Sequence, residues 1–170
     1  LAKHLGAMVA TTTSAGNIEW VKRLGADVVI DYKEHDFETL LHGYDLVLHS
    51  QDAKTLEKSL RVLKPGGKLI SISGPPDPDF ANEIGAPGFL KLVFRLLSFG
   101  VRKQASRLKV SFSFLFMRAN GRQLGLITDL IDTGVIRPVV DRVFSFDEIN
   151  EALAYVEKGR AKGKVVVKMR

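Results

Sequence analysis

The sequence predicts an α/β fold in which helices alternate with the strands of a parallel sheet. A short apolar run, Met8-Val9-Ala10, is flanked by Gly6 and hydroxyl residues, which is typical of a buried parallel strand. Ile18, Val21 and Leu24 then keep helical spacing, and Val28-Val29-Ile30 begins another buried strand. A strand, a helix and a strand in this order indicate half of a nucleotide-binding sheet.

The same alternation continues along the chain. Asp36 to Leu41 reads as a short helical piece, Tyr44 to His49 as a third strand, and Thr55 to Leu63 as a helix. A Lys-Pro-Gly-Gly turn over residues 64–67 leads into the strand Lys68 to Ser73. This order favours a parallel sheet with right-handed crossovers.

The pattern breaks at Gly74. Residues 74–88 carry four prolines and read as a long loop, a kind of segment that is often functional at strand ends. Phe89 to Gln104 follows as one apolar helix. Arg107 to Phe116 alternates and is rich in Val and Phe, which predicts a strand near the end of the sheet.

The C-terminal third returns to helix and strand. Arg122 to Thr133 has helical spacing, and Val135 to Phe144 is extended. Ser145 and Glu148 have the spacing of a capping box that opens a helix ending at Gly159, and a last strand runs from Lys164 to Met169. At the other end, Leu1 to Gly6 reads as the last turns of an amphipathic helix, so we expect the C-terminal part of a longer protein.

Composition indicates an ordinary globular protein. The 170 residues include 45% hydrophobic and 26% charged residues, no cysteine, and a net charge of +6. The four histidines have no metal-ligand spacing, so no metal site is expected in this chain. Basic residues are not interleaved with aromatic ones, and no apolar run reaches the about 18 residues of a membrane span. We therefore expect a soluble, cytoplasmic protein without nucleic-acid or membrane partners.

The first strand ends in hydroxyl residues, Thr11-Thr12-Thr13-Ser14, with no carboxylate before Glu19. In a dinucleotide fold, an Asp or Glu at this position binds the ribose hydroxyls and favours NAD. Hydroxyl and backbone N–H groups can instead donate to a 2′-phosphate, which indicates NADP(H). A polar loop without any ligand is the alternative, and these residues alone leave both open.

Four stretches in order carry a family resemblance: WVKRLGADVVIDY, LEKSLRVLKPGGKLISISG, LIDTGVIRPVVDRVFSFDEINEALAYVEKG and GRAKGKVVVKM. The chain resembles the medium-chain dehydrogenase/reductase superfamily, in its zinc-free quinone oxidoreductase branch. The resemblance implies a Rossmann domain over residues 1–134, with helices on both faces of the sheet but without its first strand and Gly-rich loop. Residues 135–170 would return to a GroES-like catalytic domain.

The resemblance also assigns cofactor contacts by position. Asn17 stands where some relatives have a lysine, and His49 and Gln51-Asp52 replace a family aspartate and glycine-rich turn. Tyr32 has an alternative role as a strand cap, and the two basic residues near the end can equally be a solvated terminus. The implied cofactor-binding residues are Thr12, Thr13, Ser14, Asn17, Tyr32, Ser50, Ser73, Gly74, Phe114, Leu115, Arg160 and Lys164.

The implied reaction is hydride transfer from NADPH to a quinone or an α,β-unsaturated carbonyl, carried out by the longer protein. No catalytic residue is assigned within this chain, which alone is expected to be inactive. The resemblance further implies a homodimer through the edge strand 107–116, where an apolar edge needs a partner. The alternatives are a zinc-dependent alcohol dehydrogenase fragment, a truncated non-catalytic binding or dimerisation module, and a class I methyltransferase, whose late strand resembles LRVLKPGGKLISIS.

Overall fold

The computed structural model describes residues 1–169, which form two compact units. The first unit is Gly6–Arg118 with Ala2, and the second runs from Ala119 onward and includes Leu1 and Lys3–Leu5. The division between these compact units falls between Arg118 and Ala119. The domain boundary expected at residues 134 and 135 stays a prediction.

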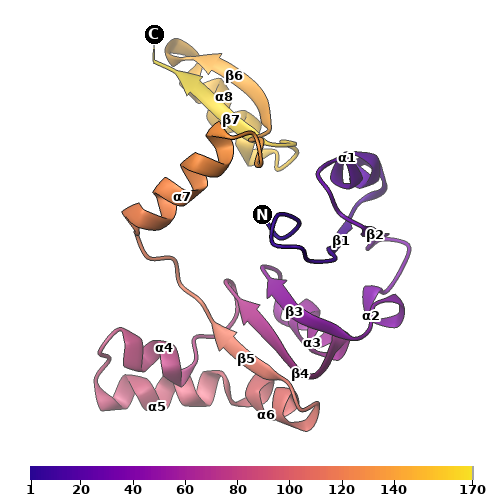
Figure 1. Ribbon diagram of the computed structural model, residues 1–170. Coiled ribbons are helices and arrows are strands. Elements are labelled where there is room, and N and C mark those ends of the chain that lie inside the picture. The colour runs from indigo at the N-terminus through magenta and orange to yellow at the C-terminus, as the bar shows by residue number, and fades with distance from the viewer. Residues whose placement is uncertain (170) are drawn as a thin grey trace. The chain divides into compact units, whose positions relative to one another are not determined.

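The first unit opens with the predicted strand, helix and strand (Figure 1). Strand β1 (Ala10–Thr13) is followed by a short 3-10 turn and helix α1 (Ile18–Arg23), and it pairs in parallel with β2 (Val28–Asp31). The threonines predicted at the end of the strand are part of it, whereas the strand begins at Ala10 and not at Met8. Helix α2 (Phe37–Leu40) comes next, as predicted.

A second parallel sheet has the order β3-β4-β5. Its strands are β3 (Tyr44–His49), β4 (Leu63–Ser71) and β5 (Ser111–Phe114), and helix α3 (Ala53–Val62) connects the first two. The predicted turn at 64–67 lies inside β4, because the pairing of β3 with β4 shifts register between Tyr44 and Leu46.

The strands of the first unit are parallel as predicted, but they form two sheets instead of one. No ladder joins β1-β2 to β3-β4-β5 among the described residues. One hydrophobic cluster holds the two sheets together: Ile30 of β2, Leu41 and Val62 are buried in it, and Val47 of β3 packs against them. Packing therefore joins two sheets that share no hydrogen-bonded edge.

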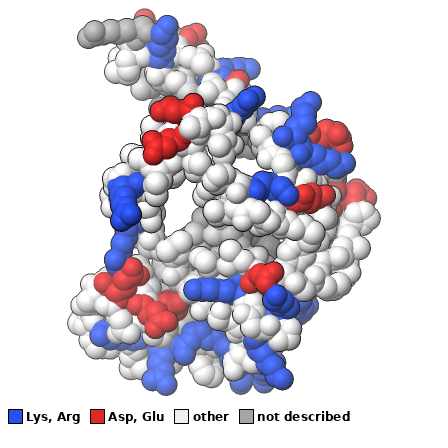
Figure 2. All heavy atoms as spheres, in the orientation of Figure 1, with Lys and Arg blue, Asp and Glu red and all other residues white. Residues whose placement is uncertain are grey.

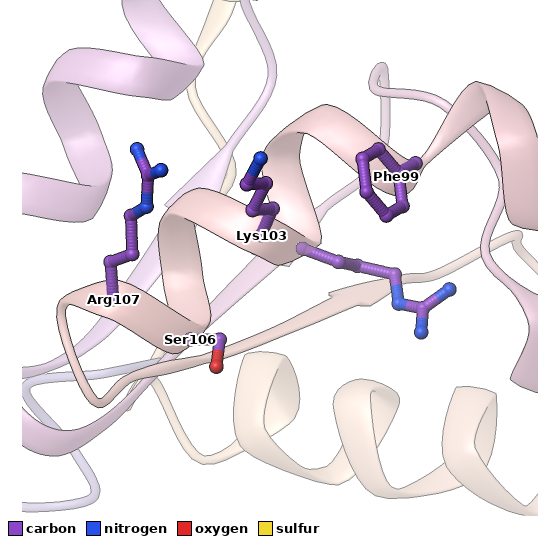
Figure 3. A pocket seen from close by; sticks show the side chains of 5 residues that line it. Phe99, Lys103, Ser106 and Arg107 are labelled. Atoms are coloured by element: carbon purple, nitrogen blue, oxygen red, sulfur yellow. The ribbon is translucent and has the colours of Figure 1, made fainter.

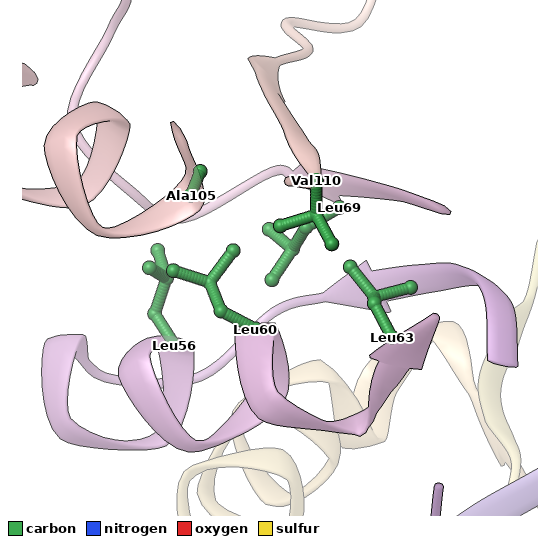
Figure 4. Packing of buried hydrophobic residues seen from close by; sticks show 6 residues of the cluster. All are labelled: Leu56, Leu60, Leu63, Leu69, Ala105 and Val110. Atoms are coloured by element: carbon green, nitrogen blue, oxygen red, sulfur yellow. The ribbon is translucent and has the colours of Figure 1, made fainter. Parts of the chain in front are cut away.

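Helices cover one face of the three-stranded sheet (Figure 4). Leu56 and Leu60 of α3 pack against Leu69 of β4 and against Ala105. On the opposite face, Leu46 and Leu48 of β3 are 55% and 67% exposed. The expectation of helices on both faces is thus not met for this sheet, although parallel sheets are usually buried on both sides.

The segment between β4 and β5 differs most from the prediction. The expected loop contains helix α4 (Pro78–Glu83), which starts with proline at a position where its missing N–H costs nothing. The expected single helix is two, α5 (Gly88–Leu97) and α6 (Phe99–Arg107), which meet at Ser98. The predicted strand starts only at Ser111, since α6 extends to Arg107 and Lys109 has a positive φ of 57°.

The second unit contains helix α7 (Gly121–Asp132) and a strand, helix and strand. Strands β6 (Val140–Ser145) and β7 (Lys164–Lys168) are parallel, and α8 (Ile149–Glu157) connects them. The predicted capping box is confirmed: the Ser145 N–H donates to the Glu148 carboxylate at 2.8 Å.

Candidate functional site

The carboxyl end of β1 carries the hydroxyl side chains that were predicted to bind the 2′-phosphate of the cofactor. Thr12, Thr13 and Ser14 end the strand and open the turn into α1. Their hydroxyl groups make no hydrogen bond to another described residue, and neither does the Asn17 side-chain amide at the start of α1. Four polar side chains at one strand end are therefore available to an external ligand.

A carboxylate that the sequence analysis missed lies beside this group. Asp31, at the end of β2, is the ladder partner of Thr13 and is buried. Its carboxylate accepts a hydrogen bond from the Lys33 N–H at 3.0 Å, so it is engaged by its own turn. The signal was present in the VVIDY ending, but only strand pairing shows that this aspartate is next to Thr13.

Tyr32 follows β2 at the same end of the ladder. Its N–H donates to the Thr13 carbonyl at 3.2 Å, which extends the pairing of the two strands by one residue. The ring is exposed, so it does not serve as a buried cap on the strand. The ring is thus accessible to a ligand at the carboxyl ends of β1 and β2.

The carboxyl ends of β3 and β4 lie side by side, because His49 and Ser71 are ladder partners. The Ser71 hydroxyl is fully buried and accepts a hydrogen bond from the Gly74 N–H at 2.8 Å. The Ser73 hydroxyl donates to the Gln51 carbonyl at 2.8 Å, which connects the two loops that follow these strands. Ser50 is exposed between them.

Phe114 and Leu115 are at the corresponding end of β5, but their N–H groups are already engaged. The Leu115 N–H donates to the Ser71 carbonyl at 2.9 Å, and the Phe114 N–H to the Asp77 carboxylate at 2.9 Å. A carboxamide at this position would therefore have to donate to their carbonyl groups. The Phe114 ring packs edge-on against Phe80 at 5.1 Å, as expected of a core residue.

Arg160 and Lys164 belong to the second unit. Lys164 is the first residue of β7, and its N–H donates to the Val139 carbonyl at 2.8 Å. Arg160 lies in the segment between α8 and β7. Their assignment to the cofactor phosphates stays a prediction.

A hollow on the surface of α6 contains none of the predicted site residues. Lysine and arginine side chains gather around α5 and α6 (Figure 2), and Lys103 and Arg107 project from the same side of α6 as Phe99 (Figure 3). The hollow is lined by Phe99, Arg102, Lys103, Ser106 and Arg107. It adjoins the start of β5, whereas the predicted site residues follow the strands' carboxyl ends.

Within the part of the chain that the structure describes, no group of three or more His, Cys, Asp or Glu side chains comes together as metal ligands. No helix there has the length and hydropathy needed to cross a membrane.

Comparison with known proteins agrees with this arrangement. A family model described as zinc-binding dehydrogenase matches residues 24–167. The chain is 33% identical to 2-methylene-furan-3-one reductase of Solanum lycopersicum, over 98% of the chain and 35% of that protein. It is 32% identical to a chloroplastic NADPH-dependent alkenal/one oxidoreductase of Arabidopsis thaliana, over 98% of the chain and 36% of the relative.

Solved structures show the same fold. The quinone oxidoreductase from Coxiella burnetii superposes with a TM-score of 0.76 at 25% identity, over 99% of this chain and 47% of that one. The chain thus spans between about a third and a half of the length of these relatives. These matches exclude the methyltransferase alternative. The chain belongs to the zinc-binding dehydrogenase family of the medium-chain dehydrogenase/reductase superfamily, and its relatives include quinone oxidoreductases.

Proposed function

We propose that this chain is the NADP(H)-binding part of an oxidoreductase that reduces a quinone or an α,β-unsaturated carbonyl. The observation that carries the proposal is the set of unengaged hydroxyl groups on Thr12, Thr13 and Ser14 at the carboxyl end of β1. In open α/β sheets, ligands bind outside the carboxyl ends of the strands. A relative described as an NADPH-dependent alkenal/one oxidoreductase and another described as a 2-methylene-furan-3-one reductase support the same assignment.

The side chains at this end fit the adenosine end of NADP(H). Hydroxyl groups of Thr12, Thr13 and Ser14 would donate hydrogen bonds to the 2′-phosphate, and the Asn17 amide would add a neutral donor where some relatives have a lysine. The buried Asp31 carboxylate is an unfavourable charge beside them. Because it accepts the Lys33 N–H, its charge is partly compensated within its own turn.

Other residues of the chain would hold the remainder of the cofactor. Tyr32 would lie at the adenosine end, Ser50 at the adenine, and Ser73 and Gly74 at the nicotinamide ribose. The Phe114 and Leu115 carbonyls would accept from the carboxamide, while Arg160 and Lys164 would lie near the phosphates. When bound, NADPH supplies the hydride, and the protein positions the acceptor.

The test uses the protein at its natural length, isolated from its source cells and measured by intact mass. We expect a mass near twice the 18.8 kDa of this chain. NADPH oxidation is then followed with an enone, a quinone and an aldehyde as acceptors, and with NADH in place of NADPH. Turnover of the enone or quinone with NADPH is expected. A mass near 18.8 kDa with no NADPH binding would instead establish the non-catalytic module.

A zinc-dependent alcohol dehydrogenase is the second candidate, because the matching family model describes zinc-binding members. Zinc content and alcohol oxidation in the same preparation distinguish the two. Turnover of alcohols that is lost on chelation would favour this candidate over enone reduction.

We also retain a cytoplasmic location as a prediction, although the Arabidopsis relative is described as chloroplastic.

We further propose that the protein dimerises through β5, which lies at the edge of its sheet. Alternate residues of a strand present their N–H groups to opposite sides. Since the Leu115 N–H faces β4, the N–H groups of Phe112 and Phe114 face the free edge, and Asp77 engages that of Phe114. Two β5 strands would therefore pair at Phe112.

Sedimentation of the natural-length protein tests this. We expect a dimer that Phe112→Pro converts to a monomer, because proline removes the outward N–H. Phe112→Leu keeps the N–H, alters the ring alone, and should remain dimeric. A monomeric wild-type protein at micromolar concentration would contradict the proposal.

A further inference from the structure

His49 and Ser71 form a buried pair at the carboxyl ends of β3 and β4. The His49 Nδ1 atom lies 3.1 Å from the Ser71 hydroxyl oxygen. His49 is 3% exposed and Ser71 is fully buried, so no bulk water reaches the pair. Among residues 1–169, the other ring nitrogen, Nε2, has no hydrogen-bond partner.

The hydrogen bonds around Ser71 determine the direction of this contact. The Ser71 oxygen already accepts from the Gly74 N–H at 2.8 Å and, more weakly, from the Ser73 N–H at 3.4 Å. The hydroxyl proton is therefore free to point at His49 Nδ1, which accepts only when it carries no proton. This arrangement places the ring proton on Nε2 and makes the neutral imidazole the form that fits.

The pair in turn determines the path of the turn after β4. A Cβ atom on Gly74 would lie 2.6 Å from the Ser71 hydroxyl oxygen and 3.0 Å from a methyl carbon of Leu56. Only glycine packs there, with its N–H directed at Ser71. Because the Ser73 hydroxyl also donates to the Gln51 carbonyl, the loops after β3 and β4 are held as one body.

We propose that His49 is a positioning residue for the nucleotide ligand, which orients Ser71 and so holds the Ser73–Gly74 turn beside the exposed Ser50. The proposal rests on the NADP(H) function above, and it assigns a role to the histidine that replaces the family aspartate. His49 itself does not touch the ligand, since it is buried at the end of β3.

Protonation of His49 disrupts this arrangement. An imidazolium would donate from Nδ1, and the Ser71 proton would then have no acceptor in a buried site, which is costly. Burial lowers the pKa of His49 below its ordinary value, against smaller opposing effects of the Asp52 backbone and of the Asp52 carboxylate, the charged group that faces it. The turn is therefore ordered at neutral pH and loosened in acid.

The experiment measures NADPH binding to the natural-length protein by fluorescence titration between pH 5.5 and 8. Amide hydrogen exchange at Gly74 is measured in parallel without cofactor. His49→Asn places an amide oxygen near the Nδ1 position, where it can accept from Ser71, whereas His49→Leu removes the acceptor. His35→Asn, at an exposed histidine, is the matched control.

We expect His49→Leu to weaken NADPH binding about five- to tenfold at pH 7.5, the size of one lost hydrogen bond, and to speed Gly74 exchange. His49→Asn should stay within about threefold of wild type, by the same measure, and should lose the wild-type weakening in acid. His35→Asn should match wild type throughout. Should His49→Leu not fold, Ser71→Ala removes the same His49–Ser71 hydrogen bond by deleting the hydroxyl group.

Two results would overturn the proposal. One is wild-type affinity, pH dependence and Gly74 exchange in His49→Leu or Ser71→Ala. The other is a wild-type pH profile in His49→Asn, which would mean that another group titrates. Wild-type protein that binds no NADPH at any pH would instead overturn the proposed function, whereas Gly74 exchange would still report on the His49–Ser71 pair.

Discussion

The buried carboxylate of Asp77 joins helix α4 to the outer edge of β5 by accepting the Phe114 N–H at 2.9 Å. The same carboxylate caps α4, since it also accepts the Phe80 N–H at 2.8 Å. A charged side chain that covers the edge of a sheet limits pairing with other strands there. Asp77 therefore both starts a helix and ends the accessible part of the β5 edge.

Asp77→Asn should destabilise the first unit by about 1–3 kcal/mol, because an amide has one oxygen where two N–H donors need acceptors. The NH2 group would face one of these donors and leave it buried and unpaired. Urea denaturation of wild type and variant measures the difference. Asp79→Asn, at an exposed aspartate of the same helix, is the control and should stay within about 0.5 kcal/mol of wild type. Equal midpoints for both variants would show that the Phe114 contact contributes nothing.

Local sequence signals predicted some elements residue by residue. Strand β3 was predicted with its observed bounds, Tyr44–His49, and the Ser145–Glu148 capping box is present. Both depend on neighbours within a few positions of the chain. The same reasoning missed the start of β5, because the alternation over residues 107–116 continues through the end of α6 and the positive φ of Lys109.

Contacts between distant segments were beyond such signals. The sequence showed no acidic residue between Thr13 and Glu19, yet Asp31 lies beside Thr13 across the ladder. The engagement of the Phe114 N–H by Asp77 likewise spans 37 positions. Both contacts bear on the cofactor assignment, and both depend on how distant segments pack in the fold, which a single sequence leaves open.

Cofactor choice provides a second prediction. Thr13→Asp places a carboxylate beside Asp31, so two negative charges would face a 2′-phosphate. We expect NADPH affinity of the natural-length protein to fall about tenfold or more relative to NADH, the effect of about 1.4 kcal/mol. Ser106→Asp adds the same charge on α6 and should leave the preference unchanged. An unchanged ratio of NADPH to NADH dissociation constants in Thr13→Asp would mean that the ribose end lies elsewhere.

Gly74 provides a third prediction, which needs no ligand. Gly74→Ala should cost about 1–3 kcal/mol of folding free energy, because its Cβ would lie 2.6 Å from the buried Ser71 oxygen. Gly100→Ala, on α6 with no atom from outside its own stretch of helix within 4 Å of the added carbon, should instead stabilise by up to about 1 kcal/mol. Thermal unfolding of both variants measures the difference. Equal effects would show that the turn can move away from Ser71.

The last prediction concerns acid and the second unit. Hydrogen bonds from the Ser145 N–H and hydroxyl, at 2.8 and 2.7 Å, hold the pKa of Glu148 below its ordinary value. A lowered carboxyl pKa means that the unfolded chain binds the proton more readily, so this stabilisation is complete above about pH 4.3 and is lost as pH falls further. E148Q keeps an oxygen that can accept the Ser145 N–H but has no charge. Its melting temperature should therefore lie below that of wild type at pH 7, and the two should converge toward pH 3. E151Q removes an equal charge one turn later in α8 and should show no such convergence. A constant difference in melting temperature between wild type and E148Q across this pH range would exclude the capping box as an acid-labile contact.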